Sequence, residues 1–286
     1  MPLVPLAKVL SMARARRGYA VGLVCLGWDD AEVFVAAGDE AGIPVILSAG
    51  PGARAHIPIP VWGAMFRALG ARAACPVVAH LDHGRTVEEC QAAIDAGFTS
   101  VMIDGSALPL RDNIALTADV SRRARAGGVS VEAELGYVGY AHGRASRGTE
   151  PRDVAAFVSE VEIDALAVSV GNTHLQIEAS GCIDWARVLA ITPSTDLPLV
   201  LHGGSGVPVS DRIRLARDHG FAKINVGTEL RQAYGSALRR VLLDDPDLFD
   251  RIAIARAVRP RFLTRVRAVL AQGWNGGDRG RSDPAG

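Results

Sequence analysis

The sequence has few aromatic residues, an even balance of charge and no clustered cysteines, and each feature argues against a class of function. Aromatic residues are 5% of the 286 residues, too few for the stacking platforms of proteins that bind single-stranded nucleic acid. Lys+Arg and Asp+Glu both number 31, so no basic surface for a polyanion is expected. The four cysteines form no CxxC pair, which favours a reduced protein in the cytoplasm; they are Cys25, Cys75, Cys90 and Cys182.

Long apolar runs are also missing. No run approaches the roughly 20 apolar residues that a membrane-spanning helix needs, so we expect no membrane partner. The residues after Met1 lack the charged segment and apolar core of a signal peptide. The last residues are rich in Gly, Arg and Asp. We therefore expect residues 1–274 to form the folded domain and residues 275–286 to form a disordered tail.

Short apolar runs rich in β-branched residues recur along the chain, with starts about 20–35 residues apart, the size of a β-α unit. Such runs are expected where helices cover a parallel sheet. The segments between them have helical signals, such as the Thr86 cap and the stop at Gly97. The pattern predicts an α/β fold, a single (β/α)8 TIM barrel with a C-terminal helical extension. The predicted strands are Val21–Leu26, Pro44–Ala49, Val77–Asp82, Ser100–Asp104, Ser130–Gly136, Ala165–Val170, Leu199–Gly203 and Ala222–Gly227.

Polar residues lie at the ends of six consecutive predicted strands, where functional side chains of this barrel gather. Three of them are histidines, namely His83, His174 and His202. A single His at a strand end is more often a hydrogen-bonded structural residue. Three that converge on the barrel mouth, with one open position, match a catalytic zinc site. His80 shares the strand parity of Asp82, so we expect it to pack inside the barrel.

Glycine-rich turns follow the last two predicted strands. Loops at these positions commonly hold phosphate in this fold, through backbone N–H groups that glycine lets approach closely. Two hydroxyl groups lie in the same turns. The sequence therefore predicts a site for a substrate phosphate, whose residues are Gly203, Ser205, Gly227 and Thr228.

Five motifs, in this order and spacing, resemble class II fructose-bisphosphate and tagatose-bisphosphate aldolases from about Leu10 to about Gln272. They are His80-Leu-Asp-His, Met102-Ile-Asp-Gly-Ser, Val131-Glu-Ala-Glu-Leu-Gly, Leu201-His-Gly-Gly-Ser-Gly and Ile224-Asn-Val-Gly-Thr-Glu-Leu. The resemblance implies a zinc-dependent aldolase that makes or cleaves a carbon–carbon bond between dihydroxyacetone phosphate and an aldehyde. It also implies a phosphorylated sugar substrate and a homodimer or homotetramer.

The resemblance assigns roles to single residues. His83, His174 and His202 would bind Zn²⁺, and Asp82 would be the catalytic acid and base. Asn225 would contact the enediolate, which the metal stabilises. Members of the family also bind a monovalent cation, Na⁺ or K⁺, near the phosphate. Two further carboxylates would orient the ligands or hold an alternate metal position, unless they are only buried and hydrogen-bonded; they are Asp104 and Glu134.

Three positions depart from the family pattern. His142 stands where the family has an acidic residue that exchanges the enediolate proton, and it either replaces that residue or is a loop histidine without a role. Leu175 replaces a glycine, and a leucine is strained at positive φ, so contacts to the phosphate or the cation are expected to differ. The segment that begins at Cys25 replaces an Asn-containing one and lines the pocket, so a different aldehyde partner is expected.

Other functions remain open at this point. A metal-dependent sugar-phosphate isomerase or epimerase would use the same enediolate chemistry on the same barrel. A non-catalytic sugar-phosphate-binding relative would have kept the fold alone, although the intact Asp82-His83 pair argues against it. The chain has two lysines, Lys8 and Lys223, and Lys223 lies close to Asn225 in the sequence. A Schiff-base lysine is therefore not excluded by count, but the three histidines favour a metal.

Overall fold

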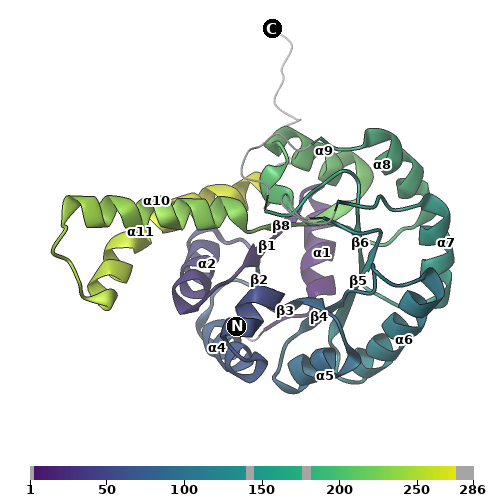
Figure 1. The fold of residues 1–286 in the computed structure, drawn as a ribbon, viewed down its shortest axis with the longest axis horizontal. Coiled ribbons are helices and arrows are strands. Elements are labelled where there is room, and N and C mark those ends of the chain that lie inside the picture. The colour runs from purple at the N-terminus through teal and green to yellow at the C-terminus, as the bar shows by residue number, and fades with distance from the viewer. Residues whose placement is uncertain (1–2, 140–144, 176–181, 275–286) are drawn as a thin grey trace, which may run out of the picture.

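The computed structural model describes residues 3–139, 145–175 and 182–274. Its strands pair in parallel and in sequence order, and β8 closes onto β1 (Figure 1). The predicted (β/α)8 barrel is confirmed, with every strand close to its predicted position. The strands are β1 Ala20–Val24, β2 Val45–Ala49, β3 Val77–Gly84, β4 Ser100–Ile103, β5 Ser130–Leu135, β6 Ala165–Val168, β7 Leu199–Leu201 and β8 Phe221–Val226.

Helices on the outside of the barrel connect the strands (Figure 1). The capping signals of α5 are present as predicted, because the Thr86 hydroxyl accepts a hydrogen bond from the Glu89 N–H at 3.1 Å. Gly97 follows this helix at φ +85°. The helices are α2 Trp28–Ala41, α3 Pro51–His56, α4 Ile59–Arg72, α5 Val87–Asp95, α6 Leu110–Ala126, α7 Pro151–Glu160, α8 Trp185–Ile191 and α9 Val209–His219, with short 3₁₀ turns η1 Thr192–Ser194 and η2 Gly204–Gly206.

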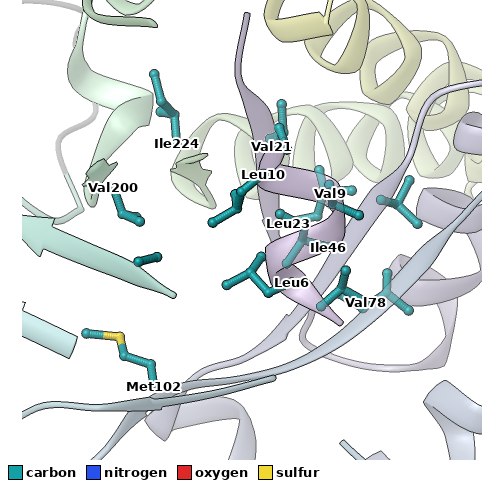
Figure 2. Packing of buried hydrophobic residues seen from close by; sticks show 14 of the residues in the cluster. Leu6, Val9, Leu10, Val21, Leu23, Ile46, Val78, Met102, Val200 and Ile224 are labelled. Carbon is teal, nitrogen blue, oxygen red and sulfur yellow. The ribbon is translucent and has the colours of Figure 1, made fainter. Parts of the chain in front are cut away.

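One helix, α1 (Leu6–Ala15), precedes the first strand and was not among the predicted elements. Its Ala7 N–H donates to the hydroxyl of Ser130, the first residue of β5, at 3.1 Å. The helix therefore covers the barrel at the N-terminal ends of the strands. Its apolar side chains are fully buried against strand residues (Figure 2), and they are Leu6, Val9 and Leu10. This end of the barrel is closed, and functional side chains of the fold gather at the opposite end.

The last two helices, α10 (Thr228–Asp244) and α11 (Arg251–Trp274), form the predicted helical extension. They make a hairpin that projects away from the barrel before α11 returns to it (Figure 1). The return is fixed by packing on α2, where the Phe34 and Phe262 rings lie 5.9 Å apart. Along the described part of the chain, no helix has both the length and the apolar character needed to span a membrane.

Candidate metal centre and active site

Two consecutive residues, Asp82 and His83, both line a cavity of about 320 Å³ at the C-terminal end of the barrel. Neighbouring side chains of a regular strand point to opposite faces. Here the pairing of β3 with β4 shifts register between Leu81 and Gly84, and His83 has φ +53°. A bulge of this kind turns a side chain toward a different face. The irregular end of β3 therefore brings both side chains to one site.

The guanidinium of Arg54, in α3, holds this irregular backbone. It is almost buried, with 5% of the side chain exposed, and its Nη1 donates to the carbonyl oxygens of Ala49 (2.5 Å) and Asp82 (2.6 Å). Its Nη2 donates to the His83 carbonyl at 3.0 Å, and its Nε to Glu89 at 2.9 Å. A strained residue persists only where its surroundings fix it. Sequence reasoning did not identify Arg54, which lies 28 residues before Asp82.

The structure brings His83, His174 and His202 together, with one possible ligand atom of each within 4.8 Å of the others. The His83 and His202 rings are 4.6 Å apart, and His174 lies 5.3 Å from His83. The Nε2 atom of His83 and the Nδ1 atom of His202 are buried without a hydrogen-bond partner. Buried nitrogens normally have a partner, and a cation would supply one. Three nitrogen donors around a shared space fit a zinc ion.

Carboxylates orient two of these rings through the opposite nitrogen, as is usual for histidine ligands. The His83 Nδ1 lies 2.8 Å from Asp104 Oδ2, and the His202 Nε2 lies 3.0 Å from Glu132 Oε1. Glu134 Oε2 lies 3.5 Å from His83 Nδ1 and 3.6 Å from His202 Nδ1. The role of Glu132 was not predicted. Its signal was the spacing of Glu132 and Glu134, which places both on the same face of β5.

The charges around the three rings favour a cation. Burial opposes protonation of His83, but the carboxylates of Asp82, Asp104 and Glu134 outweigh it and raise the pKa of His83 to about 9. Burial and the nearby His83 lower the pKa of His174 to about 3. Burial and Asp104 raise the pKa of Glu134 to about 8. A metal ion would take the place of the His83 proton, because ligand histidines must be neutral.

Asp82 is held as a carboxylate at the same site. Burial opposes its ionisation, but the positive charges near it, first that of His83, keep its pKa well below the usual range. Asn225 donates from Nδ2 to Asp82 Oδ1 at 3.2 Å. A Cβ atom at Gly22 would lie 2.1 Å from the Asn225 Oδ1, so glycine is needed there to make room for Asn225. A proton acceptor and an amide therefore face the cavity together.

Lys223 points into the barrel interior and does not line the cavity. Its Nζ lies 2.7 Å from Glu132 Oε2 and 3.1 Å from His80 Nε2, and the side chain is fully buried. A Schiff-base lysine needs contact with the substrate, which this position does not allow. His80 also bonds to Ser100 at 2.9 Å, so its predicted packing inside the barrel is confirmed.

The predicted phosphate residues, Gly203, Ser205, Gly227 and Thr228, all line the cavity. Gly203 has φ +62°, and a Cβ atom there would meet a backbone oxygen at 2.3 Å. The Ser205 hydroxyl accepts hydrogen bonds from the Gly227 and Glu229 N–H groups, each at 3.2 Å. Its own proton can still be donated to a ligand. The turn after β7 and the start of α10 are thereby joined.

The three departures from the family pattern have different outcomes. Leu175 adopts a positive φ, +57°, although it is not a glycine; its side chain lines the cavity and is 47% exposed. Cys25 is buried, whereas its neighbours Val24 and Leu26 line the cavity. His142 lies outside the described residues.

Three kinds of comparison with known proteins point to the same family. The family model for fructose-bisphosphate aldolase class-II matches residues 4–273. The chain is 40% identical over 266 residues to 6-phospho-5-dehydro-2-deoxy-D-gluconate aldolase of Halalkalibacterium halodurans, covering 89% of this chain and 90% of that protein. It is 39% identical over 260 residues to fructose-bisphosphate aldolase of Geobacillus stearothermophilus, covering 87% and 89%. The crystal structure of the YdjI aldolase from Escherichia coli K12 aligns with a TM-score of 0.83 at 29% identity, over 96% of this chain and 99% of that one.

Proposed function

Because the chain belongs to the class II fructose-bisphosphate aldolase family, we propose that it is a zinc-dependent aldolase. It joins dihydroxyacetone phosphate to an aldehyde, or cleaves the product of that reaction. One observation carries the proposal. The ligand atoms of His83, His174 and His202 lie within 4.8 Å of one another in the cavity that also holds Asp82.

The residues divide the reaction between them. A zinc ion on the three histidines would supply positive charge for the oxygen atoms of the enediolate. In cleavage, Asp82 takes the proton of the hydroxyl group on the carbon that becomes the aldehyde. The carbon–carbon bond then breaks, and its electron pair stays with the dihydroxyacetone phosphate carbon, which later takes up a proton. Asn225, bonded to Asp82 at 3.2 Å, holds the reacting oxygen atoms in place.

The phosphate would lie at the start of α10. Backbone N–H groups of Gly203 and Thr228 and the Ser205 hydroxyl would bind it, with Gly227 leaving room beside them, and the helix dipole favours an anion there. A Na⁺ or K⁺ ion near this phosphate is part of the same proposal.

Two carboxylates have a supporting role. Asp104, 2.8 Å from the His83 Nδ1, orients that ring. Glu134 lies between His83 and His202 and offers an alternate metal position.

His142 is our candidate for the group that returns a proton to the dihydroxyacetone phosphate carbon. It replaces the acidic residue of the family at this point of the sequence.

We also propose that the enzyme works in the cytoplasm, because its scattered cysteines suit a reducing compartment. We propose a homodimer or homotetramer, because large apolar side chains are exposed on the helical extension.

The experiment measures aldol activity and zinc content together. We expect Asp82→Asn to lower kcat by about 10²–10⁴-fold, because a proton acceptor is lost, while bound zinc stays the same. Asp119→Asn, on the outer face of α6, is the matched control and should behave as wild type.

His142→Ala should slow exchange of the dihydroxyacetone phosphate carbon-bound proton with solvent. Full activity after complete zinc removal by a chelator would overturn the metal mechanism. Exchange without carbon–carbon cleavage of any ketose phosphate would favour an isomerase.

A further inference from the structure

Two leucines lie in the cavity in positions that cost free energy, through backbone strain at one and exposed apolar surface at both. Leu175 combines a left-handed backbone, φ +57°, with a side chain that is 47% exposed. Leu26, from the segment after β1, is 42% exposed in the same cavity. A glycine at position 175 would remove both the strain and the exposed apolar surface. Strain held at a ligand site points to a function, and apolar surface facing a cavity has its natural partner in an apolar ligand group.

The charges of the cavity are unevenly placed. Among the described residues that line it, Arg231 is the only lysine or arginine, and it lies about one turn after Thr228 in α10. Arg231 and the start of α10 can therefore bind one phosphate group. Away from this phosphate site, the histidines, Asp82 and Asn225, the rest of the described wall has no polar side chain. It consists of Gly50, Gly52 and the aliphatic residues Val24, Leu26, Pro51, Ala53 and Leu175.

That wall would bind a second phosphate group poorly. A phosphate monoester carries a charge of about −1.5 to −2 at neutral pH. Against these aliphatic side chains it would lose hydration without gaining a side-chain hydrogen-bond donor, which is unfavourable. An aliphatic chain would instead be transferred from water to an apolar surface.

We propose that Leu26 and Leu175 form an acceptor subsite for an aldehyde that has an apolar chain and no phosphate. The inference rests on the proposed aldolase function and names the substrate class of the same site. The two leucines select the acceptor, whereas the phosphate of dihydroxyacetone phosphate remains at Ser205, Thr228 and Arg231.

The test is an acceptor series. Zinc-loaded protein is assayed with dihydroxyacetone phosphate and ethanal, propanal, butanal or pentanal, and with glyceraldehyde 3-phosphate. For the wild type we expect kcat/KM to rise about 4-fold for each added methylene, the factor that transfer of one methylene from water predicts. We also expect butanal to exceed glyceraldehyde 3-phosphate.

The double variant Leu26→Asn/Leu175→Gly tests the two side chains. Glycine accepts φ +57° without strain, so the backbone at position 175 is preserved. The increase should fall to about 2-fold or less per methylene, because the apolar wall is lost. Leu189→Asn, an exposed leucine of α8 outside the cavity, is the control and should keep the wild-type increase.

Exchange of the dihydroxyacetone phosphate carbon-bound proton with solvent, measured without any acceptor, separates the two proposals. No exchange by the wild type would overturn the aldolase function itself. Exchange together with a preference for glyceraldehyde 3-phosphate, or with no dependence on chain length, would overturn only the apolar subsite. A wild-type dependence on chain length in the double variant would show that these leucines do not form it.

Discussion

At the residue scale, the position of the candidate metal ligand His83 depends on a side chain that never enters the cavity. Arg54 donates to the carbonyl oxygens of Asp82 and His83 and to that of Ala49 at the end of β2. It thereby ties two strand ends together where His83 has φ +53°. A left-handed residue costs about 1–2 kcal/mol, which these hydrogen bonds offset.

We expect Arg54→Met to lower the free energy of unfolding by about 2–4 kcal/mol, since buried carbonyl groups lose their partners. We expect it to weaken zinc binding about 10–100-fold, because His83 is no longer held in place. Urea unfolding and competition with a chelator measure the two effects. Arg122→Met, whose side chain is 72% exposed on α6, should change stability by no more than about 0.5 kcal/mol. Unchanged zinc affinity in Arg54→Met would contradict the positioning role.

Sequence reasoning brought the histidines together and named two carboxylates beside them, Asp104 and Glu134. It did not find the roles of Arg54, Glu132 and Lys223. His83, His174 and His202 follow strands, and the barrel topology sends all strand ends to one face. Arg54 and Lys223 give no such signal, because their partners depend on how distant segments pack. The positive φ of Leu175 ran against the preference of its residue type, since the surrounding turn decides the backbone there.

At the element scale, the barrel strands were predictable because both their faces are buried, which makes their sequences continuously apolar. α1 also has a signal that was not used. Its apolar residues at positions 6, 9, 10 and 13 follow the helical period. Where that helix docks could not be read from the sequence, because many apolar helices surround the same barrel and periodicity does not choose among the faces.

Because α1 packs across the closed end of the barrel, we expect a substitution in its buried face to lower stability and leave substrate binding unchanged. Leu10 is fully buried, so Leu10→Ala should lower the free energy of unfolding by about 2–5 kcal/mol through lost burial and a cavity. The KM for dihydroxyacetone phosphate should stay unchanged, since α1 lies at the opposite end of the strands from the site. Denaturant unfolding and steady-state kinetics measure both. Leu243→Ala, at a leucine that is 75% exposed, is the control; a loss of stability no larger than in that control would rule out the packing described for α1.

At the scale of the whole molecule, the helical extension has large apolar side chains that the described part of the chain leaves exposed. The α10–α11 hairpin projects from the barrel (Figure 1), and large apolar side chains near its tip are exposed. Leu243 is 75%, Phe249 90% and Ile252 64% exposed. Apolar clusters of this kind usually mark an interface in a soluble protein. A second copy of the chain is the partner that the predicted homodimer or homotetramer would supply.

Charged substitutions at the hairpin tip test whether the extension forms an interface between copies of the chain. We expect Phe249→Glu/Ile252→Glu to weaken self-association at least about 100-fold, because two buried apolar contacts would be replaced by unpaired carboxylates. Sedimentation velocity over a concentration range measures the change as a shift toward the monomer mass. Leu189→Glu places the same charge on an exposed leucine of α8, 58% exposed and away from the hairpin, and should leave the mass unchanged. If the double variant keeps the wild-type mass, the hairpin tip does not form the interface, since two carboxylates at a buried contact would have to disrupt it.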